Sequence, residues 1–171
     1  MNYKSILFFL GIYSLFVSFF SFLNILYSIY FSYIIDINSY TISLITSLVA
    51  GVLFIFLGYK HVKGISLIDQ IILIILSFIF IPFLICLPYY FSGYDINFIN
   101  SYFESISGFT TTGFSILENR VENINEPLLL WRSSSQWLGG LLDRDSLCAR
   151  LLGSVWEIRN EKMRLDFEIK V

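Results

Sequence analysis

The chain has 171 residues, of which 56% are hydrophobic and 19% aromatic, while only 14% are charged. A soluble domain normally carries about a quarter charged residues, so this composition is typical of an integral membrane protein. The formal net charge of −2 provides no basic surface to neutralise phosphates. Nucleic acid is therefore not an expected partner, whereas the lipid bilayer is.

The first predicted element is a membrane-spanning helix. Ser5 to Ile35 is an uncharged run of 31 residues, longer than the roughly 20 residues that a helix needs to cross the hydrocarbon layer. Lys4, just before the run, also fits a signal peptide. The run is too long for the apolar part of such a peptide, and no small-residue cleavage site follows it. We therefore expect a retained transmembrane helix.

Two further membrane spans are predicted downstream. A short polar break at residues 36–39 separates the first run from the second span, Tyr40 to Tyr59. Gly51 and Gly58 lie within this second span, and such small residues let two membrane helices approach closely. The third span runs from Leu67 to Phe91. The predicted fold class is therefore all-α, a polytopic membrane protein with three to four transmembrane helices.

The charged residues between these spans predict their orientation. Lys4, Lys60 and Lys63 fall on one side of the predicted spans, whereas Asp36 and Asp95 fall on the other. Basic residues are enriched on the cytoplasmic side of membrane proteins. We therefore expect a cytoplasmic N-terminus and an external loop around Asp95.

A short amphipathic helix is predicted on the external side, from Phe98 to Ser107, with Gly108 ending it. About ten residues are too few to cross the bilayer, so an element that enters from outside must dip in and return. The C-terminal end of such a helix carries a partial negative charge, which favours a cation beside the residues that follow. This segment is therefore the predicted re-entrant pore helix.

Three consecutive threonines and a glycine follow the short helix and form the predicted selectivity loop. Carbonyl and hydroxyl oxygens replace the water around a cation, and glycine tolerates the positive φ that a tight loop requires. Irregular backbone at membrane depth is tolerated only where protein buries it or where it lines a watery cavity. The segment therefore either forms a pore loop or lies outside the bilayer. The candidate ion-binding residues are Thr110, Thr111, Thr112 and Gly113.

The chain is predicted to return through a helix that begins near Pro127. Arg132 falls inside this helix, and a charge at membrane depth is costly unless it is paired or faces a cavity. Glu104, in the short helix, is a candidate partner, so Glu104 and Arg132 are the predicted structural supports of the pore. Gly139 and Gly140 would permit tight helix packing.

The sequence holds no arrangement typical of an enzyme. The serines at residues 133–135 have no His or Asp partner in range, and no paired carboxylates are evident. His61 is the only histidine, and Cys86 and Cys148 lie far apart. We therefore expect no catalytic residues, no disulfide and no cofactor.

The order and spacing of these segments resemble a known family. Residues from about 64 to 140 resemble the first repeat of the bacterial Trk/Ktr potassium transporters. The resemblance rests on FESISGFTTTG at residues 103–113, Trp-Arg at 131–132 and QWLGG at 136–140. The two predicted helices before residue 64 look like the extra N-terminal pair of the TrkH branch.

The resemblance implies four helix–pore-loop–helix repeats around one pore in a bacterial cytoplasmic membrane. It implies K⁺ uptake, with K⁺ bound at Thr111 and Thr112, and with Thr110 and Gly113 flanking them. It also implies a cytosolic nucleotide-binding regulatory subunit and a homo-oligomer as partners.

The C-terminal part departs from the family. The resemblance divides the chain into an N-terminal helix pair (1–60), a first pore-loop repeat (61–142) whose second helix is cut short, and a polar tail (143–171) unlike the family. The charged residues 143–145 would lie roughly 24 Å along a helix that began at Pro127. We therefore expect a truncated or frameshifted product that does not transport K⁺ alone. The alternative is a small structural or regulatory membrane protein in which the threonine segment is an ordinary external loop.

Overall fold

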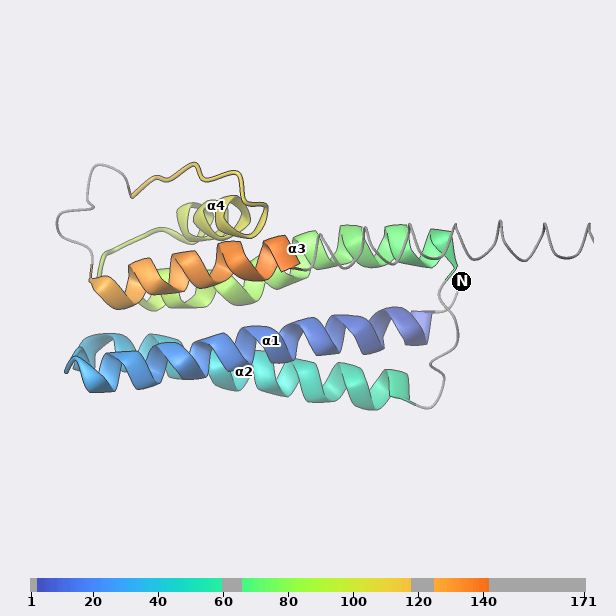
Figure 1. The fold of residues 1–171 in the computed structure, drawn as a ribbon, viewed down its shortest axis with the longest axis horizontal. Coiled ribbons are helices and arrows are strands. Elements are labelled where there is room, and N and C mark those ends of the chain that lie inside the picture. The colour runs from blue at the N-terminus through green and yellow to red at the C-terminus, as the bar shows by residue number, and fades with distance from the viewer. Residues whose placement is uncertain (1–2, 60–65, 118–124, 142–171) are drawn as a thin grey trace, which may run out of the picture. The chain divides into compact units, whose positions relative to one another are not determined.

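The computed structural model describes residues 3–59, 66–117 and 125–141. Three of its helices are long and apolar enough to cross a membrane, which confirms the predicted class of all-α polytopic membrane protein. Lys60 and Lys63, on which the predicted orientation partly depends, and the polar tail at 143–171 lie outside the described residues. The helices are α1 (Tyr3–Tyr30), α2 (Ile34–Gly58), α3 (Leu67–Phe91), α4 (Phe98–Phe109) and a further helix over residues 126–141 (Figure 1).

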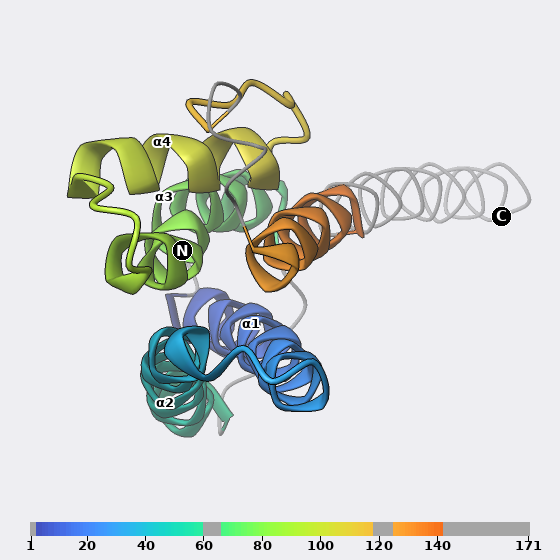
Figure 2. The same cartoon turned by 90° about the vertical axis from the view of Figure 1, so that its left-hand side faces the viewer.

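The long helices form two neighbouring groups within the unit that ends at Gly140. Successive long helices run in opposite directions, so α1 and α2 form an antiparallel hairpin (Figure 1). The second group contains α3, α4 and the helix over residues 126–141. Figure 2 looks along the long helices and shows that α4 lies across α3 rather than alongside it. The site described below lies in this second group.

Two predicted boundaries are wrong. The polar residues 36–39 do not break the chain but lie inside α2, because the turn comes earlier, at Ser32, which has a φ of 63°. Gly108 does not end the short helix, which continues to Phe109. A Cβ at Gly108 would lie 2.6 Å from the hydroxyl oxygen of Ser135. Gly108 therefore allows close packing rather than helix termination. The predicted bounds of α3 are confirmed.

Small residues hold α1 and α2 together. A Cβ at Gly58 would lie 2.5 Å from the carbonyl oxygen of Lys4, so α1 and α2 approach closely there, as predicted. The buried hydroxyls of Ser21 and Ser43 lie 3.1 Å apart across the helix pair. Lipid tails are as apolar as leucine, so membrane helices associate through such close packing and hydrogen bonds rather than through hydrophobic burial.

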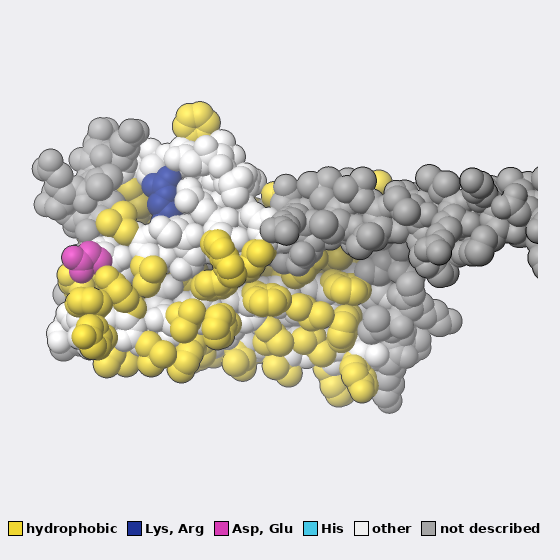
Figure 3. All heavy atoms as spheres, viewed as in Figure 1, with side chains coloured by type: hydrophobic (Ala, Val, Ile, Leu, Met, Phe, Trp, Pro, Cys, Tyr) yellow, Lys and Arg dark blue, Asp and Glu magenta, His cyan; other side chains and the backbone are white. Residues whose placement is uncertain are grey.

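The outer face of the α1–α2 hairpin is apolar. Hydrophobic side chains cover this face over most of its length (Figure 3). Phe56 of α2 is 83% exposed, and Phe19 of α1 is 55% exposed. An exposed surface of this kind suits contact with lipid acyl chains.

Candidate ion-binding loop

The loop that follows α4 begins beside the middle of α3. The rings of Phe109 and Phe78 lie 5.5 Å apart, and the hydroxyl of Tyr102 donates to the carbonyl oxygen of Ile79 at 3.0 Å. Residues 78 to 91 of α3 span about 20 Å at 1.5 Å per residue. The C-terminal end of α4 therefore lies about 20 Å inside the end of α3 at Phe91.

The helix over residues 126–141 meets the end of α4 at the same level. A Cβ at Gly139 would lie 1.7 Å from the carbonyl oxygen of Phe109, a distance that no side chain tolerates. Residues 126 to 139 also span about 20 Å of helix. Glycine at position 139 thus allows this helix to touch the base of the loop. The tight packing predicted for Gly139 is present there.

The backbone N–H groups of the loop fold back onto the end of α4. The amide of Thr110 donates to Ile106 and that of Thr111 donates to Gly108. The carbonyl oxygen of Ser107 accepts from two amides, those of Thr112 at 3.1 Å and Gly113 at 3.3 Å. Carbonyls that a helix end leaves unpaired are thereby satisfied. The backbone N–H groups of the loop therefore donate to the protein itself, and only the carbonyl and hydroxyl oxygens could bind a ligand.

Two loop residues have positive φ. Gly113 has a φ of 84°, and no heavy atom lies within 4 Å of a Cβ built there. Glycine at this position is therefore required by conformation and not by space. Thr111 has a φ of 58°, which is rare for a β-branched residue and typical of backbone that its surroundings hold in place.

The carbonyl oxygens of the loop fall into two sets. Those of Gly113 and Phe114 accept from Nη2 of Arg132 at 3.0 and 3.3 Å. Within residues 3–59, 66–117 and 125–141, no group donates to the carbonyl oxygens of Thr110, Thr111 or Thr112. Three consecutive carbonyl oxygens are therefore available to a cation, in a segment that is exposed from Thr111 to Gly113.

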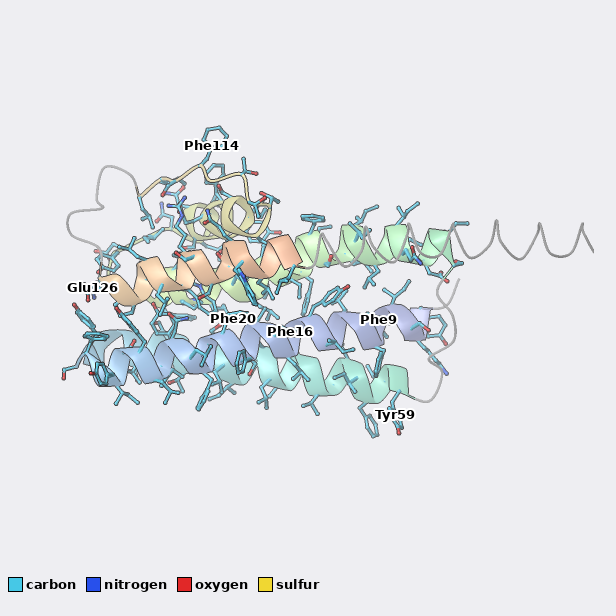
Figure 4. All side chains as sticks on the ribbon, viewed as in Figure 1. Phe9, Phe16, Phe20, Tyr59, Phe114 and Glu126 are labelled. Atoms are coloured by element: carbon cyan, nitrogen blue, oxygen red, sulfur yellow. The ribbon has the colours of Figure 1, made fainter. Side chains whose placement is uncertain are left out.

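The threonine hydroxyls link the two ends of this segment. Oγ1 of Thr110 lies 2.6 Å from Oγ1 of Thr112 and also 2.8 Å from the carbonyl oxygen of Ile106, to which it donates. This contact joins the two residues on either side of Thr111. The side chain of Phe114, just beyond, points away from the helices and is 69% exposed (Figure 4).

A buried ion pair between α4 and the helix over residues 126–141 supports the loop. Oε1 of Glu104 lies 2.8 Å from Nη1 of Arg132, and the two side chains are 2% and 19% exposed. The Glu104 carboxylate also accepts from the hydroxyl of Ser115 at 2.9 Å and from the amide of Ile116 at 3.0 Å. One carboxylate thus receives three donors, and it joins α4, the returning chain and the helix over residues 126–141.

Two further hydrogen bonds anchor the helix that carries Arg132. Nε1 of Trp131 donates to the carbonyl oxygen of Ile85 in α3 at 3.1 Å. At the helix start, the hydroxyl of Tyr33 donates to Oε2 of Glu126 at 2.8 Å. That hydrogen bond to a carboxylate raises the pKa of Tyr33, which lies outside the membrane-spanning segments. These contacts fix the helix against α3 and against the α1–α2 turn.

The structure brings all the sequence-predicted site residues into one place. Glu104 and Arg132, which sequence could only suggest as partners, are in direct contact behind the threonine loop. Sequence reasoning missed the roles of Ser107 and Ser115, because serines are common in this chain and nothing in their spacing marks them. In the described part of the chain, no cluster of His, Cys, Asp or Glu could hold a metal.

Comparison with known proteins confirms the resemblance to Trk-type potassium transporters. The chain is 29% identical over 99 residues to an uncharacterized cation transporter of Methanocaldococcus jannaschii. It is 37% identical over 73 residues to the Trk system potassium uptake protein TrkI of Halomonas elongata. These matches cover 55% and 43% of this chain but only 21% and 15% of the relatives. No family model matches the chain, and no solved structure matches it.

Proposed function

We propose that this chain contributes a pore loop to a Trk-type potassium uptake system, in a bacterial cytoplasmic membrane with its N-terminus in the cytoplasm. The observation that carries this proposal is the set of three consecutive carbonyl oxygens, at Thr110, Thr111 and Thr112, that have no donor within the described residues. They lie about half-way along a helix of membrane-spanning length. Similarity to TrkI supports K⁺ as the ion.

A K⁺ ion enters such a site by exchanging hydration water for carbonyl oxygens. We assign K⁺ to Thr111 and Thr112, with Thr110 and Gly113 flanking them. The negative end of the α4 dipole lies directly before these residues and favours a cation. Arg132 lies close to the same site, but Glu104 balances its charge at 2.8 Å. The pair therefore supports the loop without leaving an isolated positive charge beside the cation.

One loop does not surround an ion. Thr111, Thr112 and Gly113 are exposed, so the remaining oxygens must come from other pore loops. We therefore propose that the chain alone does not transport K⁺. The resemblance supplies the expected partners: further pore-loop repeats or copies, and a cytosolic nucleotide-binding regulatory subunit.

Growth at low potassium tests this proposal in cells that lack their own K⁺ uptake. The intact chain is compared with TrkI in which the similar segment is replaced by residues 98–140 of this chain. We expect the hybrid to restore growth and the intact chain alone to fail. Two glycine substitutions in the hybrid provide a matched comparison. Gly113→Ala strains a positive φ, whereas a Cβ at Gly140 meets Thr111 at an ordinary 3.9 Å.

We expect Gly113→Ala to abolish growth and Gly140→Ala to preserve it. Equal growth of both hybrids would contradict the ion-binding role of the loop. Restored growth by the intact chain alone would contradict the requirement for further loops.

A further inference from the structure

The helix over residues 126–141 presents one face to the loop, and two contacts on that face bracket Gln136. Arg132 donates to the carbonyl oxygen of Gly113 at 3.0 Å. A Cβ at Gly140 would lie 3.9 Å from Cγ2 of Thr111. Gln136 is four residues from each, which places it about 6 Å along the helix from both and rotated by about 40° from each. Gln136 thus lies on the loop-facing side, between the residue that contacts Gly113 and the residue that contacts Thr111.

The side chain of Gln136 is half-buried and forms no hydrogen bond with any residue that the structure describes. A glutamine amide has one acceptor oxygen and two N–H donors. Leaving these groups unpaired in a membrane environment is unfavourable, so such a residue normally faces a polar partner or a watery cavity. The loop residue between Thr111 and Gly113 is Thr112, whose carbonyl oxygen also has no donor in the described part.

We propose that Gln136 is a specificity-determining residue whose amide oxygen coordinates the partly dehydrated monovalent cation beside the carbonyl oxygen of Thr112. This inference rests on the proposed function and adds a ligand from outside the loop. Ion selectivity in such sites depends on the number and field strength of the coordinating oxygens. A neutral amide oxygen resembles a backbone carbonyl in charge, so it extends the oxygen set without adding the negative charge that would favour a divalent cation.

Disulfide cross-linking in the intact chain tests the placement, independently of any transport. The natural cysteines are first replaced, as Cys86→Ala and Cys148→Ala. Thr112→Cys is then combined either with Gln136→Cys or with Ser134→Cys. Ser134 lies on the other side of the same helix, beside a small cavity that it shares with Val17 and Phe20. A disulfide requires Cα atoms about 4.4–6.8 Å apart.

We expect mild oxidation to join positions 112 and 136 but not positions 112 and 134. Equal cross-linking of the two pairs, or cross-linking of the control pair alone, would overturn the placement of Gln136.

The ion-binding role is tested in the hybrid transporter, in which residues 98–140 of this chain replace the similar segment of TrkI, because the chain alone lacks the other pore loops. Thermal unfolding of this hybrid is followed in detergent, with K⁺ exchanged for choline at constant ionic strength. We expect Gln136→Leu to weaken the apparent K⁺ affinity about five-fold, as loss of one neutral polar contact would. Gln136→Glu should increase stabilisation by Ca²⁺ relative to K⁺. The exposed neighbour Ser133, whose hydroxyl donates to the carbonyl oxygen of Leu129 in its own helix, supplies the control Ser133→Ala, which should match the unaltered hybrid.

The outcomes separate this inference from the proposed function. A K⁺ effect that Gln136→Leu leaves intact would overturn the role of Gln136 alone. No K⁺ effect in any variant, with the predicted cross-link present, would overturn both the role of Gln136 and the proposed function.

Discussion

The α1–α2 hairpin and the loop region are held together by different means. In the hairpin, glycines bring the backbones together, and buried serines such as Ser21 and Ser43 bond across the interface. In the loop region, a buried carboxylate and a guanidinium hold an irregular segment of backbone between two helices. Regular helices satisfy their own backbone groups, whereas an irregular segment at membrane depth needs other partners.

This difference separates the polar groups that helix packing explains, in the hairpin, from those that it does not explain, in the loop region. Small residues suffice for the hairpin, and its outer face is apolar. The loop region carries charges that are costly to bury, and it still leaves the carbonyl oxygens of Thr110, Thr111 and Thr112 without donors among the described residues. The unfavourable free energy of burying these groups is consistent with a segment held in shape to bind an ion.

The largest effect is expected from Glu104→Ala. Removing the carboxylate leaves Arg132 without its partner and removes two further hydrogen bonds, so we expect a loss of about 3–5 kcal/mol in the free energy of unfolding. Ser43→Ala in the hairpin should cost about 1 kcal/mol, as is typical of polar contacts between membrane helices. Reversible unfolding in mixed detergent micelles measures both. Similar losses for the two variants would contradict the distinction between the regions.

Two glycine substitutions sharpen the same comparison. Gly139→Ala forces a methyl group against the backbone oxygen of Phe109 at 1.7 Å, whereas at Gly51 the nearest atom is Cδ2 of Leu15 at 2.7 Å. A leucine side chain adjusts more readily than backbone does. We expect Gly139→Ala to destabilise by about 3 kcal/mol and Gly51→Ala by about 1 kcal/mol. Equal effects in the unfolding assay would argue against close contact at the base of the loop.

The smallest effect is expected within α4 itself. The hydroxyl of Ser107 donates to the carbonyl oxygen of Phe114, beyond the loop, whereas that of Ser105 donates to Ser101 in the same helix. Ser107→Ala should therefore cost about 1 kcal/mol and Ser105→Ala less. Hydrogen exchange of the loop amides should accelerate only in the Ser107 variant. Faster exchange in both variants would indicate a general loosening of α4.

Much of the fold could be predicted from sequence, because membrane spans leave a strong signal. The bounds of α3 follow from an apolar run between polar residues, and they agree with the structure. The sequence predicts the turn between α1 and α2 at residues 36–39, inside what is in fact α2, because Asp and Asn suit the first turn of a helix as well as a loop. The turn itself lies at Ser32, which adopts a positive φ that its neighbours in the sequence do not predict.

The composition of the candidate site could also be predicted, but its internal geometry could not. The threonine run, Glu104 and Arg132 stand out because packing gives no reason for them. Which carbonyl oxygens are free depends on the φ of Thr111 and on the direction of the Arg132 side chain. The φ of Thr111 and the direction of the Arg132 side chain are set by contacts between segments distant in sequence. No local sequence pattern predicts such contacts.

Accessibility of a cysteine at position 112 tests the central claim most directly. Thr112→Cys and Asn97→Cys are compared in the assembled transporter in membranes, with the natural cysteines replaced and a large membrane-impermeant thiol reagent added from outside. Asn97 precedes α4 and is exposed. We predict rapid labelling at position 97 and labelling at least tenfold slower at position 112, with K⁺ slowing it further. Equally rapid labelling at both positions would contradict a loop held within the membrane.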